Sequence, residues 1–251
     1  MNFKLLNRIV NGFLITGGIL AMFGLISIWF VIGGILGYLT FLLIVSTNVQ
    51  FNFFVKGFNR NPEVSGKKVA ITFDDGPVEN TLKILEILDK YDVKASFFCI
   101  GKNIEENPEI FKSILQKGHF VGNHSYSHTC KMGFLSTDKI VEEIKKCDEV
   151  ALKIGGVKLN CFRPPFGVIN PRTKKALEIT GHKVIGWNIR SYDAVLNSKR
   201  YILNRILKRI KPGDVILLHD SNRQTSDILE QLLLFLETNH ITSVRVDNLF
   251  Q

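Results

Sequence analysis

The feature that most constrains this 251-residue chain is a run from Ile9 to Val55 that contains no charged side chain. The run is about twice the roughly 20 residues that a helix needs to cross a bilayer. We therefore expect residues 1–56 to form a membrane anchor with two transmembrane helices, near 9–30 and 31–47, and a reversal around Trp29–Gly34. One long tilted span followed by an interfacial segment is the alternative. A cleaved signal peptide fits poorly, because the run is too long and has no clear small-residue cleavage site.

The charges beside this run indicate on which side of a membrane the rest of the chain lies. The first 56 residues carry three basic residues and no acid, so the remainder carries 9 − 3 = +6 of the net charge of +9. Basic residues stand on both flanks: Lys4, Arg8, Lys56, Arg60, Lys67 and Lys68. Two spans would therefore place both ends in the cytoplasm, at a bacterial inner membrane, whereas one span would export the downstream domain. Trp29 and Tyr38 are candidate anchors at the membrane interface.

The composition excludes several classes of protein. With 45% hydrophobic and 22% charged residues, the chain is typical of a globular protein with a sizeable core. The basic excess forms no Lys/Arg cluster interleaved with aromatics, so nucleic acid is not an expected partner. Anionic lipid, an anionic glycan or a plain solvated surface explains it instead. Four cysteines at irregular spacing are expected to be free buried thiols, which favours a reducing compartment: Cys99, Cys130, Cys147 and Cys161.

Residues 67–251 show short apolar runs that alternate with amphipathic stretches, after a polar segment at 57–66 that we interpret as a linker. The expected strands are Val69–Phe73, Ala95–Ile100, Phe120–Asn123, Lys183–Asn188, Val215–Leu218 and Val244–Val246. The clearest helix is STDKIVEEIKKCDEVALKIGG, with apolar residues at three- and four-residue spacing, a cap at Ser136 or Thr137 and an end at Gly155-Gly156. Near-continuous apolar strands between helices indicate an α/β fold with a mainly parallel sheet.

Polar side chains follow these strands, at the edge where reactive residues of α/β folds gather. KVAITFDDGP places Asp74 and Asp75 after an apolar run, and GNHSYSHTC carries His124 and His128. One aspartate with two histidines supplies three N/O ligands and an open position, which suits zinc or a similar divalent ion that activates water. The H-x-x-x-H pair alone is equally typical of two surface histidines. Cys130 is a candidate fourth ligand that would make the site structural.

The neighbouring carboxylates of Asp74 and Asp75 repel each other, so a bound cation would explain why they stand together. Neighbours at an extended strand end point to different sides. We therefore expect one carboxylate to bind the metal and the other to face the metal-bound water as a general base. Without a metal, the pair is a turn acid followed by a helix-capping acid.

Three further polar residues follow apolar runs. GDVILLHDS brings His219 to the same edge, either as a satisfied core histidine or as a general acid that protonates a leaving amine. CFRPPFG carries Arg163, which is either a surface cation or the group that keeps Asp74 ionised and oriented. GWNIRSYDA carries Asp193, which would favour the charged form of His219.

The segments TFDDGP, HSYSH, RPPFG and LLHD, in this order, resemble motifs of the polysaccharide deacetylase family, the NodB-homology domain of chitin, chitooligosaccharide and peptidoglycan deacetylases. The resemblance covers residues 67–251. It implies a distorted, incomplete (β/α) barrel. It also implies metal-dependent hydrolysis of the linear amide that joins an acetyl group to an amino sugar, with Zn²⁺ as the ion or Co²⁺, Ni²⁺ or Mn²⁺ in its place.

The same resemblance assigns roles to residues. It implies Asp74 as the general base and Arg163 as the arginine that steadies this base. It implies His219 as the general acid and Asp193 as the aspartate that tunes this acid. The implied metal ligands are Asp75, His124 and His128. The Phe166 backbone N–H would help to hold the oxyanion, and Leu217 would form a wall of the acetyl pocket. The chain departs from the family at Ala194, where a tryptophan is common, so a wider acyl pocket or a substitute side chain is expected there.

These observations predict a membrane-anchored, metal-dependent deacetylase whose partners are the bilayer and an N-acetylated glycan. A cytoplasmic domain would act on a lipid-linked amino sugar, and an exported one on peptidoglycan or a surface polysaccharide. The alternatives are a catalytically silent glycan-binding protein, a deformylase or deacylase of a lipid-linked amino sugar, and a metal-dependent peptidase. The presence of base, ligands and acid argues against a silent protein, and the assembled motifs argue against a peptidase.

Overall fold

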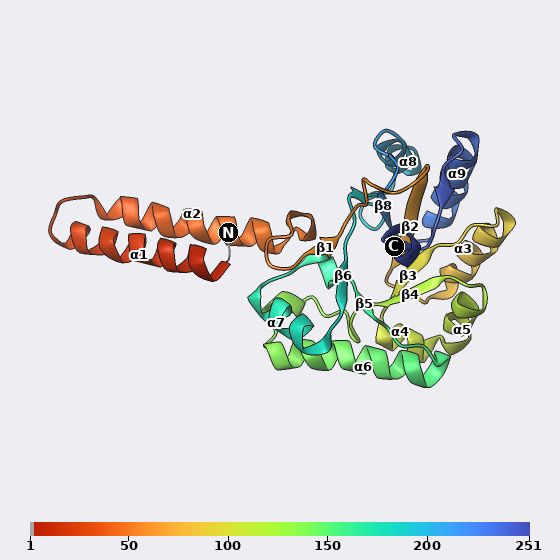
Figure 1. The fold of residues 1–251 in the computed structure, drawn as a ribbon, viewed down its shortest axis with the longest axis horizontal. Helices are drawn as coiled ribbons and strands as arrows, with labels where there is room; N and C mark the ends of the chain where they lie inside the picture. Colours follow the sequence, from red (N-terminus) through yellow and green to blue (C-terminus); the bar gives the residue numbers. More distant parts are fainter. Residues whose placement is uncertain (1–2) are drawn as a thin grey trace.

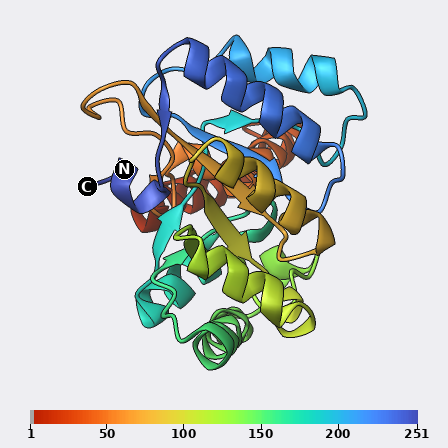
Figure 2. The same cartoon turned by 90° about the vertical axis from the view of Figure 1, so that its right-hand side faces the viewer.

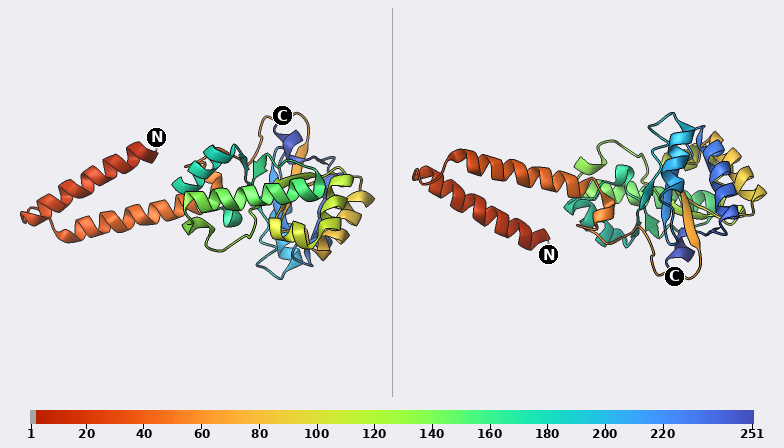
Figure 3. Two further views of the ribbon diagram at one scale, coloured as in Figure 1. Left: turned by 90° about the horizontal axis from the view of Figure 1, so that it is seen from below. Right: turned by 90° about the horizontal axis from the view of Figure 1, so that it is seen from above.

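A computed structural model describes residues 3–251, with the backbone alone for Lys4. The chain begins with an antiparallel pair of helices, α1 (Phe3–Met22) and α2 (Ile28–Ser46), which projects away from the rest of the molecule (Figures 1 and 3). Both helices are long and apolar enough to cross a membrane, and Val45 is the one apolar side chain of the two that is buried among the described residues.

The reversal between these helices occupies residues 23–27, so the prediction of a reversal at Trp29–Gly34 is wrong. Gly24 adopts a left-handed φ of 72°, and the Ser27 side chain caps α2 by accepting a hydrogen bond from the Trp29 N–H. A glycine turn and a serine cap thus set the position of the reversal. Neither interrupts the apolar run, so the run itself does not show where the chain turns. The Tyr38 hydroxyl donates to Asn7 Oδ1 (2.9 Å) and joins the two helices. Residues 1–2 of the predicted anchor lie outside the described part.

The rest of the chain is a curled sheet of parallel strands with helices on its outside (Figures 1 and 2). The strand order is β1-β6-β5-β4-β3-β2-β8-β7, with β9 beside β2. The strands are β1 (Gly57–Phe58), β2 (Lys68–Asp74), β3 (Ser96–Cys99), β4 (Phe120–Asn123), β5 (Cys161–Phe162), β6 (Lys183–Ile185), β7 (Ile189–Arg190), β8 (Val215–His219) and β9 (Thr242–Ser243). Since β1 and β7 are edges, the sheet is an incomplete barrel, which confirms the predicted fold class.

All of the following helices except the last connect strands and surround the sheet (Figure 2), whereas the last follows β9 and packs its Val246 and Leu249 into the same cluster as Ala70. The helices are α3 (Glu79–Lys90), α4 (Gly101–Glu106), α5 (Pro108–Gln116), α6 (Thr137–Gly155), α7 (Pro171–Thr180), α8 (Lys199–Leu207), α9 (Thr225–Thr238) and α10 (Val246–Leu249). Helix α6 matches the predicted helix, with Ser136 as its cap and Gly156 at a left-handed φ of 66° behind it. Short 3₁₀ turns lie at Val49–Phe51, Met132–Phe134 and Pro165–Gly167.

Alternation along β2 divides the core into two layers. Ile71 and Phe73 face the helices, and the Phe73 ring stacks on Phe97 at a centroid distance of 5.0 Å. Ala70 belongs to the inner cluster of the barrel, so Thr72 and Asp74, which share its face, also point inward. Because the reactive residues of β2 and β8 lie at their inward-facing carboxyl ends, one mouth of the barrel receives them.

Residues 57–66, predicted as a linker, instead begin the folded domain. Residues 57–58 pair with β6, and the Phe58 ring packs against Phe250 at 5.1 Å. The Asn61 N–H donates to the Gly213 carbonyl (2.8 Å). A strand of two residues is too short to show an alternating pattern, so the polar composition of the segment hid it.

Two other parts of the strand prediction also differ from the structure. A strand at Val244–Val246 is wrong, since β9 ends at Ser243 and Val246 begins α10. The strand predicted over Lys183–Asn188 ends at Ile185, and Gly186, on which a Cβ would overlap the Asn59 side chain, follows it.

Gly213 should tolerate alanine far less well than Gly156. Both have left-handed φ values (88° and 66°), where an alanine costs about 1–2 kcal/mol. A Cβ on Gly213 would also overlap the Asn61 carbonyl, whereas Gly156 has open space. We expect Gly213→Ala to lower the free energy of unfolding by about 3 kcal/mol or more, through strain plus overpacking. Denaturant titration in detergent measures the free energy of unfolding of Gly213→Ala and of Gly156→Ala. Equal losses in these two variants would contradict the importance of the contact between Gly213 and Asn61.

Candidate active site

Parallel pairing brings the predicted site residues to one mouth of the barrel. Asp74 ends β2 directly opposite His219, the last residue of β8. His124 follows β4, Arg163 follows β5, and Asp193 lies three residues after β7. All of these strands are parallel, so their carboxyl ends share one edge of the sheet.

The candidate metal centre consists of Asp75, His124 and His128. One ligand atom from each residue lies within 4.8 Å of the other two. Asp75 Oδ1 is 3.6 Å from His124 Nε2 and 3.5 Å from His128 Nε2. Two imidazole nitrogens and one carboxylate oxygen form the donor set of zinc and similar divalent ions.

The surroundings of His124 make this set fit a metal ion. His124 Nδ1 lies 2.7 Å from the Arg163 carbonyl, to which it donates, so Nε2 presents its lone pair to the other two ligands. Burial and the nearby His128 lower the pKa of His124 from 6.5 to about 3, which keeps the ring in its neutral, metal-binding form. Cys130 is exposed and lies outside the cluster, so it does not close the site.

The backbone of Asp75 decides how the two neighbouring carboxylates are arranged. Strand β2 ends at Asp74, and Asp75 has a left-handed φ of 77°. Both side chains therefore reach the same imidazole, with Asp74 Oδ2 at 3.7 Å and Asp75 Oδ1 at 3.6 Å from His124 Nε2. The prediction that they point to different sides is wrong, because it assumed an extended backbone through both residues.

The turn after these aspartates depends on a residue to which sequence analysis gave no role. Asp220 is fully buried, and its Oδ2 accepts a hydrogen bond from the Thr81 hydroxyl (2.6 Å). A Cβ on Gly76 would overlap this carboxyl group, so only glycine fits there. Burial raises the pKa of Asp220 to about 7. Its position directly after His219 was the only signal in the sequence.

Arg163 is completely buried, so the interpretation as a surface cation is wrong. Its Nη1 donates to Asp74 Oδ1 (2.7 Å) and to the Thr72 hydroxyl (2.8 Å). Nη2 and Nε donate to the carbonyls of Gly186 (2.9 Å) and Ile185 (3.2 Å). These bonds fix the Asp74 carboxylate and turn its Oδ2 toward the metal centre.

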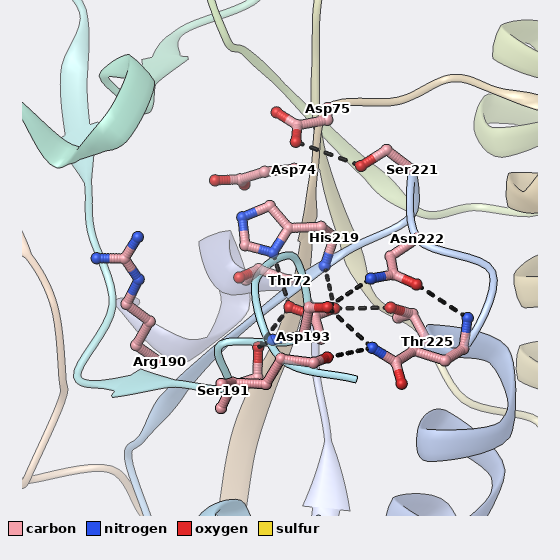
Figure 4. A network of polar contacts seen from close by, with 12 residues as sticks. Thr72, Asp74, Asp75, Arg190, Ser191, Asp193, His219, Ser221, Asn222 and Thr225 are labelled. Carbon is pink, nitrogen blue, oxygen red and sulfur yellow. Dashed lines mark hydrogen bonds and ion pairs between the residues drawn. The ribbon is translucent and has the colours of Figure 1, made fainter. Parts of the chain in front are cut away.

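Asp193 holds His219 through both of its carboxylate oxygens (Figure 4). Oδ1 accepts from His219 Nδ1 (2.7 Å) and the Ser191 hydroxyl (2.6 Å), and Oδ2 accepts from the His219 N–H (2.8 Å) and the Thr225 hydroxyl (2.7 Å). Burial raises the pKa of Asp193, but the bonds from His219 and the hydroxyls outweigh it and hold that pKa below 3.8. Neither hydroxyl stands in a motif from which its bond to Asp193 could have been predicted.

The same contacts set the charge of His219. Burial lowers the pKa of His219, but the hydrogen bond and charge of Asp193, helped by Asp74 and Asp75, raise it to about 8. Because Nδ1 is bonded to Asp193, Nε2 is the nitrogen left to face a substrate. His219 therefore suits the role of an acid at neutral pH.

The structure also shows where the two predicted pocket residues lie, and where Ala194 lies, the position at which the chain departs from the family. Phe166 has a left-handed φ of 59°, and its ring packs 4.8 Å from the His128 ring. Leu217 is buried on the same face of β8 as His219. Their roles in the oxyanion site and the acyl pocket stay predictions. Ala194 is exposed, and a wider pocket or a substitute side chain at this place stays a prediction.

Comparison with known proteins relates this geometry to a family. The family model described as polysaccharide deacetylase matches residues 61–185. A peptidoglycan-N-acetylglucosamine deacetylase of Bacillus cereus is 34% identical over 73% of this chain and 68% of its own length. The peptidoglycan-N-acetylmuramic acid deacetylase PdaA of Bacillus subtilis is 30% identical over 73% of this chain and 71% of its own.

A solved structure shows the same fold. BA3943 from Bacillus anthracis, described as a CE4 family pseudoenzyme, has a TM-score of 0.71 and 29% identity, over 77% of this chain and 68% of that one. A similar fold therefore does not by itself separate active from inactive proteins. The identity and arrangement of the residues at the mouth have to make that distinction.

The Arg163–Asp74 pair should show strong coupling in stability. Removing one partner of a buried ion pair costs about 3–5 kcal/mol, because the other charge is left unpaired. We expect that loss for Arg163→Met at pH 8, in the free energy of unfolding from denaturant titration. The double variant Arg163→Met/Asp74→Asn carries no unpaired charge and should be more stable than Arg163→Met alone. A double variant that is equally or less stable would show that the Asp74 charge is not what Arg163 compensates.

The pKa of His219 should fall when Asp193 loses its charge. In Asp193→Asn the burial remains while the carboxylate is gone, so the pKa should drop from about 8 to below 6.5. NMR titration of the histidine ring measures both values. The stability that the raised pKa provides is fully present below pH 6.5 and is lost as pH rises through about 8, so the two proteins should converge in stability at high pH. An unchanged pKa would contradict the role of Asp193.

Proposed function

Since this chain belongs to the polysaccharide deacetylase family, we propose that it removes N-acetyl groups from an amino sugar with the help of one divalent metal ion. The observation that carries the proposal is that a buried, oriented carboxylate, a three-residue donor set and a histidine with a raised pKa share one mouth. They are Asp74, the cluster of Asp75, His124 and His128, and His219.

Asp75, His124 and His128 would hold the metal ion, with Zn²⁺ as the first choice and Co²⁺, Ni²⁺ or Mn²⁺ as alternatives. When bound, such an ion supplies Lewis acidity that polarises the amide carbonyl and lowers the pKa of a water molecule. The neutral form of His124 and the orientation of its Nε2 support this assignment.

The other residues move protons and hold charge. Asp74, held in place by Arg163, takes a proton from the attacking water. The Phe166 backbone N–H donates to the carbonyl oxygen as it becomes negative. His219, protonated below pH about 8, gives a proton to the departing amine nitrogen as the C–N bond breaks. The products are acetate and a free amino sugar.

A silent, glycan-binding protein is the main alternative of a different class. The pseudoenzyme among the similar structures gives this alternative weight, but base, acid and all three donors are present here. Release of acetate and a free amine from an N-acetylated chitooligosaccharide or peptidoglycan fragment decides between them. The absence of both products, in a protein that binds the sugar, would favour the silent protein.

We further propose that α1 and α2 anchor the protein in a membrane and that the domain lies on its cytoplasmic side. The exposed apolar side chains of both helices and their length support an anchor. The basic residues on both flanks of the helix pair support cytoplasmic ends.

The position of α2 supports a substrate that is linked to a lipid. An apolar groove of about 350 Å³ separates α2 from the mouth, with Leu39 and Leu43 on one wall and Phe134 and Phe166 on the other. The Phe166 ring also packs against the His128 ring (4.8 Å between centroids), so one wall residue of the groove contacts the candidate metal centre. A sugar attached to a lipid in the bilayer would find its apolar part next to the site. The exposed Ala194 keeps a deformylase or deacylase of such a sugar as a second candidate.

Metal content and turnover should separate in two variants. Asp74→Asn leaves all three ligands in place, so it should keep its metal while deacetylation falls by about 10²–10⁴-fold, the usual contribution of a general base. His128→Ala removes a ligand and should lose the metal on purification. Elemental analysis and acetate release measure the two quantities. Normal turnover in Asp74→Asn would overturn the base assignment, and unchanged metal in His128→Ala would contradict the ligand set.

The domain should be found in the cytoplasm. Paired reporters fused after Gln251, one active only inside the cell and the other only outside, should give a signal from the inner reporter alone. The physical reason is that two spans return the chain to the side with its basic flanks. A signal from the outer reporter would refute this topology, leave the chemistry standing, and point to peptidoglycan or a surface glycan as the substrate.

A further inference from the structure

A second cavity, of about 160 Å³, lies where the incomplete barrel does not close. One wall is formed by residues 47–50, which directly follow α2 and precede the edge strand β1. The opposite wall carries Arg190 from the other edge strand, β7, and Arg205 and Arg209 from α8 and its C-terminal end. We call this feature the arginine cavity. It is separate from the metal centre, and the proposed mechanism uses none of its residues.

The positive charges of the arginine cavity have no acidic partner. Ion pairs of arginine in the described part of the chain involve only Arg60, Arg163 and Arg245. The three arginines therefore line one small cavity, and none of them has a carboxylate oxygen of the described residues within 4.0 Å. Like charges held in this way repel, and a bound anion would offset that repulsion.

The arginine cavity is also preorganised, because two of its arginines are held in place by other groups. Arg205 Nε donates to the Arg190 carbonyl (3.0 Å). The guanidinium carbons of Arg190 and Arg205 lie 5.1 and 4.5 Å from the centre of the Tyr192 ring. Arg190 Nε is buried and, among the described residues, has no hydrogen-bond acceptor. A buried donor without an acceptor is unfavourable, so the Arg190 side chain keeps an unmet need for an acceptor.

Arg190 connects the arginine cavity with the catalytic network. It directly precedes Ser191, which donates a hydrogen bond to Asp193. Figure 4 shows its side chain to one side of this network, with no bond drawn to its guanidinium. A residue of the arginine cavity and two residues of the network are therefore neighbours along the chain.

We propose that the arginine cavity binds the phosphate of a membrane lipid, and that in the substrate this is the phosphate that joins the amino sugar to its lipid. Guanidinium groups bind phosphate oxygens in bidentate geometry. The cavity adjoins the end of α2, which places it at the level of lipid headgroups if α2 spans the bilayer. Thr47 lines both this cavity and the apolar groove, so the lipid chain and the phosphate have adjacent sites. The proposal rests on the proposed function for its substrate and for the placement of α2.

Trp187 provides a direct test, because it lines the cavity and the chain has only one other tryptophan, Trp29. In a Trp29→Phe background, full-length protein in a non-ionic detergent is titrated with dioctanoyl phosphatidic acid, with inorganic phosphate and with neutral dioctanoylglycerol. We expect saturable quenching or enhancement of Trp187 fluorescence by phosphatidic acid. Affinity for inorganic phosphate should be at least about tenfold weaker, and dioctanoylglycerol should give no saturable change.

Two double variants on the same helix separate the cavity from general charge. Arg205→Gln/Arg209→Gln removes two cavity charges and should weaken phosphatidic acid binding by at least about tenfold. Arg200→Gln/Lys208→Gln removes the same charge from exposed positions outside the cavity and should bind like the parent. Equal weakening in both pairs, or no saturable response, would overturn the site. Equal affinity for inorganic phosphate would overturn the lipid as its source. Because the measurement needs no hydrolysis, its failure leaves the deacetylase proposal untouched, and inactivity leaves the phosphate site untouched.

Discussion

A guanidinium that is completely buried must find all of its partners inside the protein, and the active site is organised around one such group. Arg163 bonds Asp74 and Thr72 of β2 on one side and the carbonyls of Ile185 and Gly186 on the other. These carbonyls lie at the end of β6 and just beyond it, where the sheet no longer satisfies them. The carboxylate that we propose as the base is thus also the acidic partner of the buried Arg163 guanidinium. Removing either member of such a buried pair would leave the other without its partner.

The mouth gathers residues whose backbones depart from regular geometry. Asp75, His128, Phe166 and Tyr192 all have left-handed φ values, between 48° and 77°, although none is glycine. Each such residue costs about 1–2 kcal/mol, so the regular strands below must supply the stability that holds them. The strain has a chemical use. In an extended strand neighbouring side chains diverge, whereas the turn at Asp75 lets two neighbouring carboxylates meet the same histidine.

The sequence predicted those parts of the fold and site whose signal is local. The apolar run of β2 and the periodicity of α6 identified both elements, and the position of His219 after an apolar run placed it at the correct edge. It could not reveal strands of two residues, such as β1, which owe their existence to tertiary pairing. The burial of Arg163 was also hidden, since arginines are rarely buried without a partner that only the fold reveals. The bonds from the Ser191 and Thr225 hydroxyls to Asp193 could not be predicted either, since these partners too are revealed only by the fold.

The gap between the edge strands β1 and β7 of the incomplete barrel determines how the domain contacts the pair of helices α1 and α2. Edge strands leave unpaired backbone groups and exposed apolar surface, which must be covered. Val45 at the end of α2, together with Val49 and Phe54, is buried against the inner core, and the Ile169 N–H bonds the Ser46 carbonyl (2.8 Å). The end of α2 and the segment after it therefore cover part of the core that further strands would cover in a closed barrel. Their packing also fixes the mouth at a set distance from the end of α2, so the place of α2 decides where the mouth lies.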